Sequence, residues 1–256
     1  MLEWWDSWTS PPWQDLAREE LLLQASAQGR IGLFTYAWAR PALVLGYGQD
    51  PAAGIDLEAC ALLDIPVLRR LTGGTGVLYA KDLALALAVP SDHPWSRSIP
   101  ALYDAFTSAV QKALASASVD ARRPAVASGG RRPRSPICFE SDSGETLLIG
   151  GRKAFGCAQV RRKGAALVHG ALLLGVDAGL QARVYAVPRT RIEQALGAVP
   201  EEPGRSAHDW AALAARAVAD AMGEGLPSAR PAPPLPPEWS ERGRDPKWVI
   251  SGTAIA

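Results

Sequence analysis

Apolar residues follow two different spacings along the chain, and each predicts its own kind of element. Leu102, Phe106, Val110 and Leu114 recur every four residues, the spacing of one helical face. Apolar content and flanking prolines, glycines and caps predict helices at 14–28, 57–63, 102–114 and from Ser206. Runs rich in β-branched and aromatic residues predict strands at 31–38, 42–46, 66–70, 77–79, 83–89, 145–150, 153–160 and 165–174. Since helices and strands mix without strict alternation, we expect an α+β fold with a mixed sheet flanked by helices.

The C-terminal third begins with a helix signal and ends in a proline-rich segment. Ser206 followed by Asp209 resembles a capping box, and the buried side of that helix is predicted to carry Trp210, Leu213, Ala217 and Val218. Residues 226–237 then include six prolines, which is typical of an extended tail. We therefore expect one domain over 1–225 and a Pro-rich tail over 226–256.

Composition excludes several classes of protein. The 256 residues are 48% hydrophobic and 21% charged with a formal net charge of +1, so the chain is neither disordered nor basic enough to indicate nucleic-acid binding. Three cysteines argue against a disulfide framework and favour a reducing compartment. No apolar stretch is long enough to span a membrane, and the first residues lack a secretory signal, so a cytoplasmic location is expected. Nine tryptophans, four of them within the first thirteen residues, have no explanation at this level beyond packing of an N-terminal arm.

A glycine-rich turn over 71–76 is the first candidate for chemistry. It follows Arg69 and Arg70, and it matches neither a Walker loop nor a dinucleotide-binding fingerprint. Without Cβ atoms, its backbone N–H groups can approach an acyl chain or a phosphate closely. The alternative is a plain hairpin turn between two strands.

Three further residues carry possible chemistry. Lys153 could stabilise charge on a carbonyl or phosphoryl oxygen, although a lysine after Gly-Gly-Arg is usually exposed. Cys138 follows an Arg-rich segment that could lower its thiol pKa, although a lone cysteine is usually a small buried side chain. His169 interrupts an apolar strand, so it is a buried polar group that needs a partner. The spacing of the histidines and cysteines predicts no metal site.

Five short segments of the sequence match the motifs of one protein family, in the same order along the chain. They read YAWARP (36–41), LGYGQ (45–49), RRLTGGTGVL (69–78), GRKAFGCAQ (151–159) and LVHGALL (167–173). They are similar to the motifs Y-x-W-x-x-P, L-G-x-x-Q, R-R-x-[ST]-G-G-x-A-V, G-r-K-x-x-G-S-A-Q and L-x-H-G-[ST]-[IL]-L. Over roughly residues 13–180 the chain therefore resembles the lipoate–protein ligase and octanoyltransferase family, a branch of the biotin/lipoyl protein ligase fold.

This resemblance implies an enzyme that attaches a medium-chain acyl group to a lysine of a lipoyl domain. Ligases of the family use ATP and Mg²⁺ to form an acyl-adenylate, whereas octanoyltransferases take octanoyl from acyl carrier protein without a cofactor. The family's Cys-dependent transferase branch carries a Cys-Phe pair about fifteen residues before the motif lysine. Cys138 and Phe139 stand at that spacing from Lys153.

The expected mechanism is therefore octanoyl or lipoyl transfer with Cys138 as nucleophile and Lys153 as oxyanion stabiliser. The resemblance also implies a set of substrate-binding residues, namely Arg69, Arg70, Thr72, Gly73, Gly74, Gly76, Tyr79, Gly156, Ala158, His169 and Gly170. The Arg-rich segment 122–134 is a candidate contact for an acidic carrier protein. No nucleic acid or membrane is expected as a partner.

Three departures from the family pattern leave alternatives open. Tyr79 and Ala80 stand where the family usually has His-Asp, Gly76 replaces an alanine, and Cys157 replaces a serine. Cys157 thereby becomes a rival nucleophile. The alternatives to a transferase are an ATP-dependent lipoate–protein ligase and a non-catalytic acyl-binding or accessory protein. A biotin ligase is disfavoured because its G-R-G-R-x-G loop is absent from the sequence.

Overall fold

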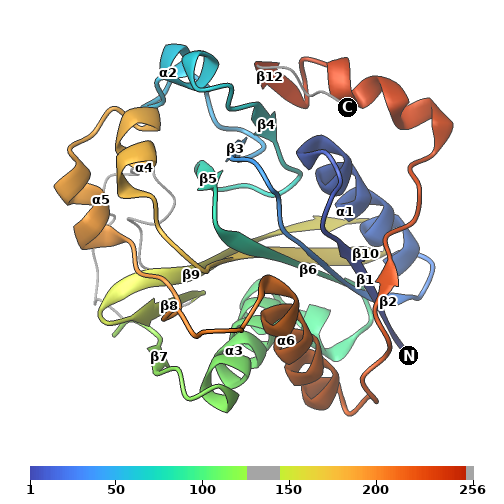
Figure 1. Ribbon diagram of the computed structural model, residues 1–256. Coiled ribbons are helices and arrows are strands. Elements are labelled where there is room, and N and C mark those ends of the chain that lie inside the picture. The colour runs from blue at the N-terminus through green and yellow to red at the C-terminus, as the bar shows by residue number, and fades with distance from the viewer. Residues whose placement is uncertain (126–144, 252–256) are drawn as a thin grey trace.

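A computed structural model describes residues 1–125 and 145–251, in which the strands form two sheets (Figure 1). Within these residues the larger sheet has eight strands in the order β11-β1-β2-β6-β10-β9-β8-β7. Its strands are β1 (Leu2–Ser7), β2 (Ile31–Tyr36), β6 (Asp82–Pro90), β7 (Ala121–Arg122), β8 (Thr146–Ile149), β9 (Arg152–Arg162), β10 (Ala165–Leu173) and β11 (Arg230–Pro231). The smaller sheet has the order β12-β4-β3-β5 and consists of β3 (Ala42–Leu45), β4 (Val67–Arg69), β5 (Val77–Tyr79) and β12 (Val249–Ser251).

Helices cover both faces of the larger sheet (Figure 1). One face carries α3 (Ile99–Ser116) and α6 (Ala207–Met222), and the other carries α1 (Pro12–Ser26) with the smaller sheet. The remaining helices of the described residues are α2 (Leu57–Leu62), α4 (Ala178–Val184), α5 (Arg189–Ala195) and the 3-10 helices η1 (Pro94–Arg97) and η3 (Pro237–Arg244). The α+β fold with a mixed sheet flanked by helices is confirmed.

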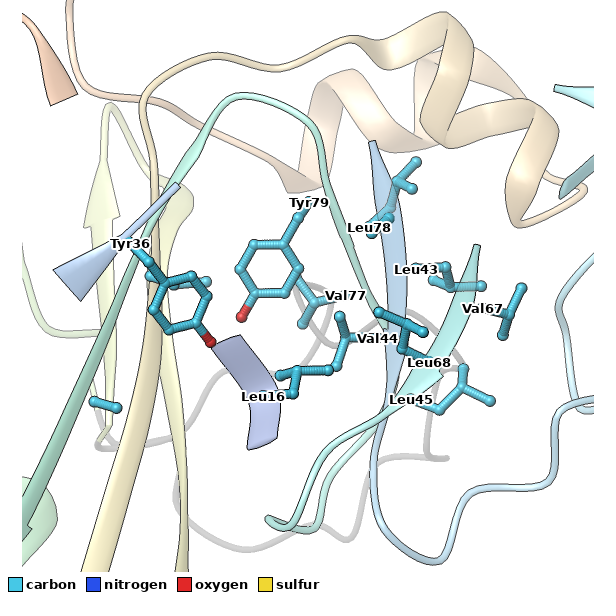
Figure 2. Packing of buried hydrophobic residues seen from close by; sticks show 14 of the residues in the cluster. Leu16, Tyr36, Leu43, Val44, Leu45, Val67, Leu68, Val77, Leu78 and Tyr79 are labelled. Carbon is cyan, nitrogen blue, oxygen red and sulfur yellow. The ribbon is translucent and has the colours of Figure 1, made fainter. Parts of the chain in front are cut away.

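The alternation of side chains along the strands divides the interior into two cores. On β10, Ala171 belongs to the core below α1 and the smaller sheet, whereas Leu172 belongs to the core beneath α3 and α6. Figure 2 shows part of the first core, where Tyr36 and Tyr79 lie beside the aliphatic residues of the smaller sheet. In the second core Phe106 of α3 packs against Phe155 of β9, with ring centroids 6.1 Å apart. A site built on β9 and β10 must therefore face one core or the other.

Most predicted elements are present, and the exceptions have physical causes. The four apolar residues spaced along α3 are all buried, and the Ser206 capping box is formed as predicted. On α6, however, Leu213 is only half-buried, and Ala211, Ala214 and Ala215 fill the contact instead. The elements β1, α4 and α5 were not predicted.

The interpretation of 71–76 as a plain hairpin turn is wrong. β4 and β5, which flank this turn, are not neighbours, since β3 lies between them and pairs with both. The turn must therefore cross over the end of β3. The predicted strands at 31–38 and 42–46 correspond to β2 and β3, which belong to different sheets although they are consecutive in the chain. The local sequence pattern indicates where strands lie along the chain, but it does not show which strands pair with one another.

The N-terminal tryptophans now have structural roles. β1 pairs in parallel with β2, and the Trp4 indole donates a hydrogen bond to Thr35 Oγ1 at 3.0 Å. The Trp8 ring stacks on His208 of α6, with centroids 3.8 Å apart. The first strand is thereby fixed to the sheet and to a helix that comes late in the chain.

Candidate active site

Lys153 is buried, which rules out the exposed-lysine alternative. Its side chain is only 4% exposed although it carries an ammonium group. On β9, Phe155 pairs with Leu147 and Lys153 pairs with Leu148, so Ala154 is the extra residue of a β-bulge. The bulge places Lys153 on the same face as Gly156, opposite to Phe155. A Cβ on Gly156 would stand 2.7 Å from Lys153 Cε, so the lysine side chain lies over this glycine.

Small residues surround Lys153 on this face of the sheet. Ala171 of β10 pairs in register with Ala84 of β6 on one side and with Gly156 of β9 on the other. Two pairs further along, and therefore on the same face, His169 lies opposite Ala158. The three central strands thus present a shallow floor of small side chains, which ends at Lys153 and faces α1 and the smaller sheet.

His169 connects this floor to the glycine-rich turn. Its Nε2 forms a hydrogen bond of 2.5 Å with Tyr79 Oη at the end of β5, and its Nδ1 bonds to Glu19 Oε1 of α1. Tyr36 Oη donates to the same carboxylate oxygen at 2.9 Å. The prediction that His169 needs a polar partner is confirmed. Residues from α1, β2, β5 and β10 meet in this buried network.

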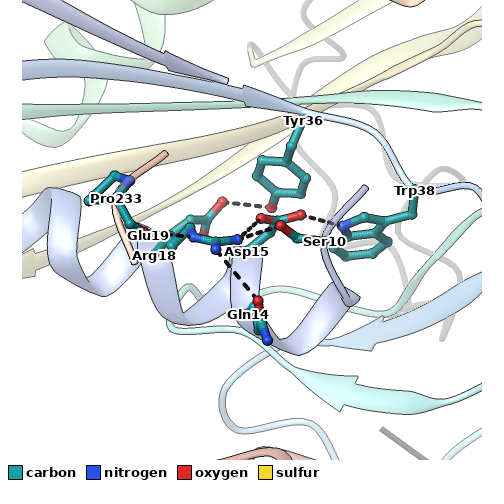
Figure 3. Close-up of polar contacts among 8 residues, drawn as sticks. All are labelled: Ser10, Gln14, Asp15, Arg18, Glu19, Tyr36, Trp38 and Pro233. Carbon is teal, nitrogen blue, oxygen red and sulfur yellow. Dashed lines mark hydrogen bonds and ion pairs between the residues drawn. The ribbon is translucent and has the colours of Figure 1, made fainter. Parts of the chain in front are cut away.

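A second part of the network lies on the same side of α1 (Figure 3). Asp15, which is fully buried, accepts hydrogen bonds from Trp38 Nε1 at 3.0 Å and from Arg18 Nη1 at 2.7 Å. Burial raises the pKa of Asp15 above its usual range, against the opposing effects of Trp38 and Arg18. Burial and the nearby Glu19 carboxylate raise the pKa of Tyr36 well above its usual range. The Tyr36 phenol therefore stays protonated and acts as a hydrogen-bond donor.

Arg69 ties the turn after β3 to β4. Its Nη1 atom donates hydrogen bonds of 2.9 Å to the carbonyl oxygens of Gly46, Tyr47 and Gln49. Since the guanidinium reaches across from β4, it holds the 46–49 turn against the strand that leads into the glycine-rich turn.

Arg70 holds the glycine-rich turn itself. It is 2% exposed, and its guanidinium donates to Thr72 Oγ1 and to the carbonyl oxygens of Val44, Gly73 and Thr75. Gly74 has φ +95°, a conformation that favours glycine. A Cβ on Gly46 would stand 2.0 Å from the Gly74 carbonyl oxygen, so the two turns touch where only glycine fits. Gly76 is fixed through its carbonyl, which accepts a bond of 3.0 Å from Tyr185 Oη.

The structure thus brings together most of the predicted site residues. The set from 69–79 and the set on β9 and β10 meet at the bond between Tyr79 and His169. Two residues face the other way. A Cβ on Gly170 would stand 2.6 Å from the Phe155 ring, and Cys157 pairs opposite Gly170 with its Sγ 3.8 Å from Thr107 of α3. Cys138 and residues 126–134 of the Arg-rich segment lie outside the described residues.

Sequence reasoning missed Asp15 and Glu19. Both are fully buried in α1, and they are spaced four residues apart, which puts them on one helical face. Leu16 and Leu23 are buried on the same helix. Two carboxylates among buried leucines are a usable signal, since a buried acid requires a hydrogen-bond donor nearby.

The described residues offer neither a metal-binding cluster nor a membrane-spanning helix. No group of three His, Cys, Asp or Glu side chains in 1–125 and 145–251 is arranged to hold a metal ion. In those same ranges, none of the helices has the length and apolar character needed to cross a membrane.

The chain is similar in sequence to known acyltransferases. The model of the lipoyl protein ligase A/B catalytic domain matches residues 11–204. Octanoyltransferase LipM of Geobacillus kaustophilus is 33% identical over 199 residues, covering 75% of this chain and 72% of the relative. Octanoyltransferase LipM of Bacillus subtilis is 29% identical over 197 residues, covering 74% and 71%.

Solved structures show the same fold. A lipoate-protein ligase A bound with ATP superposes with a TM-score of 0.72 at 22% identity, covering 90% of this chain and 88% of that one. A bi-partite lipoate protein ligase from Thermoplasma acidophilum, studied with its E2 lipoyl domain, gives a TM-score of 0.71 at 20% identity, covering 90% and 88%. The overall fold of the chain is therefore the one seen in these lipoate-protein ligases.

Proposed function

Because this chain belongs to the lipoyl protein ligase A/B catalytic-domain family, we propose that it transfers an octanoyl group to a lysine of a lipoyl domain. The octanoyltransferases among its relatives support octanoyl as the group transferred. The archaeal ligase studied with its lipoyl domain supports such a domain as the acceptor. The donor in this proposal is octanoyl-acyl carrier protein, and no cofactor takes part.

The observation that carries the proposal is the buried Lys153 at the end of a floor of small side chains. An ammonium group held away from water interacts strongly with negative charge that develops on a carbonyl oxygen. The floor formed by Ala84, Ala171 and Gly156 consists of side chains no larger than a methyl group, which suits contact with a thin aliphatic chain. This combination suits a neutral acyl group whose carbonyl must be polarised.

The proposed reaction has two steps of acyl transfer. The Cys138 thiolate attacks the octanoyl thioester carbon, the C–S bond to the carrier breaks, and the carrier thiolate leaves and takes up a proton. The amine of the acceptor lysine then attacks the Cys138 thioester, an amide bond forms, and the amine gives up a proton as the Cys138 thiolate leaves. In both steps Lys153 stabilises the oxyanion of the tetrahedral intermediate.

The remaining predicted residues bind or frame the acyl group in this proposal. Thr72, Gly73, Gly74 and Gly76 would approach it through the backbone of the turn, which Arg69 and Arg70 hold in place. Tyr79, His169, Ala158 and Gly156 would line the opposite wall. Gly170 lies on the far face, so its contribution is the space that it leaves for Phe155.

The arginines that begin the Arg-rich segment already have carboxylate partners within the chain. Of the Arg-rich segment, Arg122 pairs with Asp120 at 2.9 Å and Arg123 pairs with Asp104 at 2.6 Å. These two arginines are therefore already partly neutralised, and any contact with an acidic carrier would depend mainly on residues 126–134.

One experiment separates the three candidate functions. An apo lipoyl domain is incubated with the purified protein and either octanoyl-acyl carrier protein or lipoate with Mg²⁺-ATP, and the product is weighed by mass spectrometry. Octanoylation without ATP supports the proposal, and modification only with ATP would identify a ligase instead. No modification in either mixture would favour an accessory protein. Lys153→Gln is expected to abolish transfer, and Lys163→Gln, at an exposed lysine beyond the end of β9, serves as the matched control.

A further inference from the structure

The C-terminal segment 230–251 lies outside the part of the chain that matches the family model, residues 11–204. It nevertheless runs along α1 and contributes an edge strand to each sheet (Figure 1). Its sequence is unusual for a tail, since it contains Trp239 and Trp248 together with the arginines Arg242 and Arg244. We refer to residues 230–251 as the strap.

The first part of the strap is held by backbone hydrogen bonds. β11 pairs in parallel with β1, and the Ala232 N–H donates to the Asp6 carbonyl at 2.9 Å. Arg18 of α1 donates to the Pro233 carbonyl at 3.0 Å, and the same guanidinium binds the buried Asp15 (Figure 3). The strap therefore contacts α1 close to the buried network of the site.

Arg242 is the centre of the second anchor. Its Nη1 lies 2.6 Å from Glu20 Oε2, and the two side chains are only 20% and 25% exposed. Its guanidinium also lies 3.7 Å from the ring centroid of Trp239 and 5.2 Å from that of Trp248. An arginine held by a carboxylate and two indoles is fixed much more firmly than an exposed ion pair.

The third anchor reaches the glycine-rich turn. Val249 of β12 pairs with Leu68 of β4, and the Arg69 N–H donates to the Trp248 carbonyl at 2.9 Å. The side chain of Arg69 holds the 46–49 turn, as described above. The strap thus covers the free edge of β4 at Arg69, which holds the 46–49 turn and directly precedes Arg70, which holds the glycine-rich turn.

The second and third anchors converge on one crevice. It is lined by Trp13, Leu16 and Glu20 of α1, by Arg69 and Leu71 at the end of β4, and by Arg242 and Trp248 of the strap. Within α1, Glu20 faces Arg242 while its neighbour Glu19 binds His169. The strap therefore ties α1, which holds His169, to β4, which leads into the glycine-rich turn.

We propose that Arg242 and Trp248 are positioning residues of the acyl-transfer site, because they fix α1 and β4 at a set separation. This inference rests on the proposed function for its catalytic consequence. Its structural consequence is that the strap keeps the 46–49 and 70–76 turns ordered, and this does not depend on the proposed function. Neither residue needs to touch the acyl group. When the tie is cut, the 46–49 and 70–76 turns should open more often, and acyl binding should weaken before the chemical step changes.

Hydrogen exchange of the full-length protein tests the structural consequence. In Arg242→Gln, peptides covering 46–49 and 70–76 should exchange about tenfold faster, with α3 unchanged, because local opening does not require global unfolding. Arg244→Gln is the matched control, since Arg244 lies on the same η3 helix, is 86% exposed and lies 3.9 Å from its partner Glu241. Arg242→Lys should restore part of the protection by keeping the charge near Glu20. Uniformly faster exchange that includes α3, or no change in the two turns, would overturn the proposal.

Acyl-transfer kinetics test the catalytic consequence. Arg242→Gln and Trp248→Ala should raise KM for the octanoyl donor roughly fivefold while kcat changes less than twofold, as expected when positioning is lost but the reacting groups remain. An equal fall in kcat with KM unchanged would contradict a positioning role. If the wild-type protein transfers no acyl group, the proposed function fails, and the exchange data still decide whether the strap orders the turns.

Discussion

The side chain of Lys153 lies over Gly156 on the same face of β9. A Cβ built on Gly156 would stand 2.7 Å from Lys153 Cε and 3.2 Å from its Nζ. Real Cβ atoms do not approach other heavy atoms at 2.7 Å. Lys153 can therefore adopt this orientation only because residue 156 is a glycine. Gly156 and Lys153 therefore act together, because the absence of a side chain on Gly156 leaves the space that the Lys153 side chain fills.

Gly156→Ala should thus reduce acyl transfer while leaving the fold intact. Since the lysine tip is flexible, we expect Lys153 to move and kcat to fall about 10- to 100-fold, equivalent to roughly 1.4–2.7 kcal/mol of transition-state stabilisation. The measurement is steady-state octanoyl transfer with circular dichroism as the folding check. Gly225→Ala is the matched control, because a Cβ there meets nothing within 4 Å. Wild-type kcat in Gly156→Ala would show that Lys153 does not need this position.

Tyr79 replaces the histidine that the family resemblance leads one to expect, and its hydroxyl binds His169 Nε2. Tyr79→Phe removes this hydroxyl and leaves one side of a buried imidazole without its partner. The free energy of unfolding should fall by about 1–2 kcal/mol, the usual effect of such a loss. Urea unfolding monitored by tryptophan fluorescence measures the change. Tyr47→Phe, at an exposed tyrosine, is the control and should leave stability unchanged.

The two cysteines within the described residues are expected to be dispensable for transfer. Cys157 faces α3 rather than the face that carries Lys153, and burial raises the pKa of Cys60 to about 11, so that its thiol stays protonated at neutral pH. Cys157→Ser and Cys60→Ala should therefore retain most activity, within about threefold of wild type. Cys138→Ser should abolish it and should also abolish the acyl-enzyme adduct seen by intact-mass spectrometry. An adduct that persists in Cys138→Ser and disappears in Cys157→Ser would reverse the assignment.

The sequence was most informative where local pattern and side-chain type determine the outcome. The four-residue spacing in α3 and the capping box of α6 depend on neighbours along the chain, and both were predicted correctly. The crossover of the glycine-rich turn over β3 was not, because strand order is set by long-range packing. Family motifs indicated Lys153 and His169, but the Glu19 partner of His169 is 150 residues away in the chain. The strap was expected to be an extended tail, because composition alone does not show which edges its short strands will join.

Asp82 should make the stability of the protein depend on pH. Burial raises the pKa of this carboxyl from its usual 3.8 to about 7, although the Ala80 N–H donates to it at 2.6 Å. Between these two pH values the folded state keeps a proton that the unfolded chain releases. The folded state therefore binds more protons, and the free energy of unfolding must fall as pH rises from about 4 to about 7, then level off.

Asp82→Asn removes this titration while keeping an oxygen that can accept the Ala80 N–H. The variant should gain stability relative to wild type as pH increases, by on the order of 3 kcal/mol or less between pH 4.5 and 7.5. Urea unfolding at several pH values measures this difference. Asp92→Asn, at an exposed aspartate just beyond the other end of β6, is the control and should run parallel to wild type. If Asp82→Asn also runs parallel to wild type across this range, Asp82 is ionised in the folded protein, and the Ala80 N–H with its surroundings offsets the cost of burying its charge.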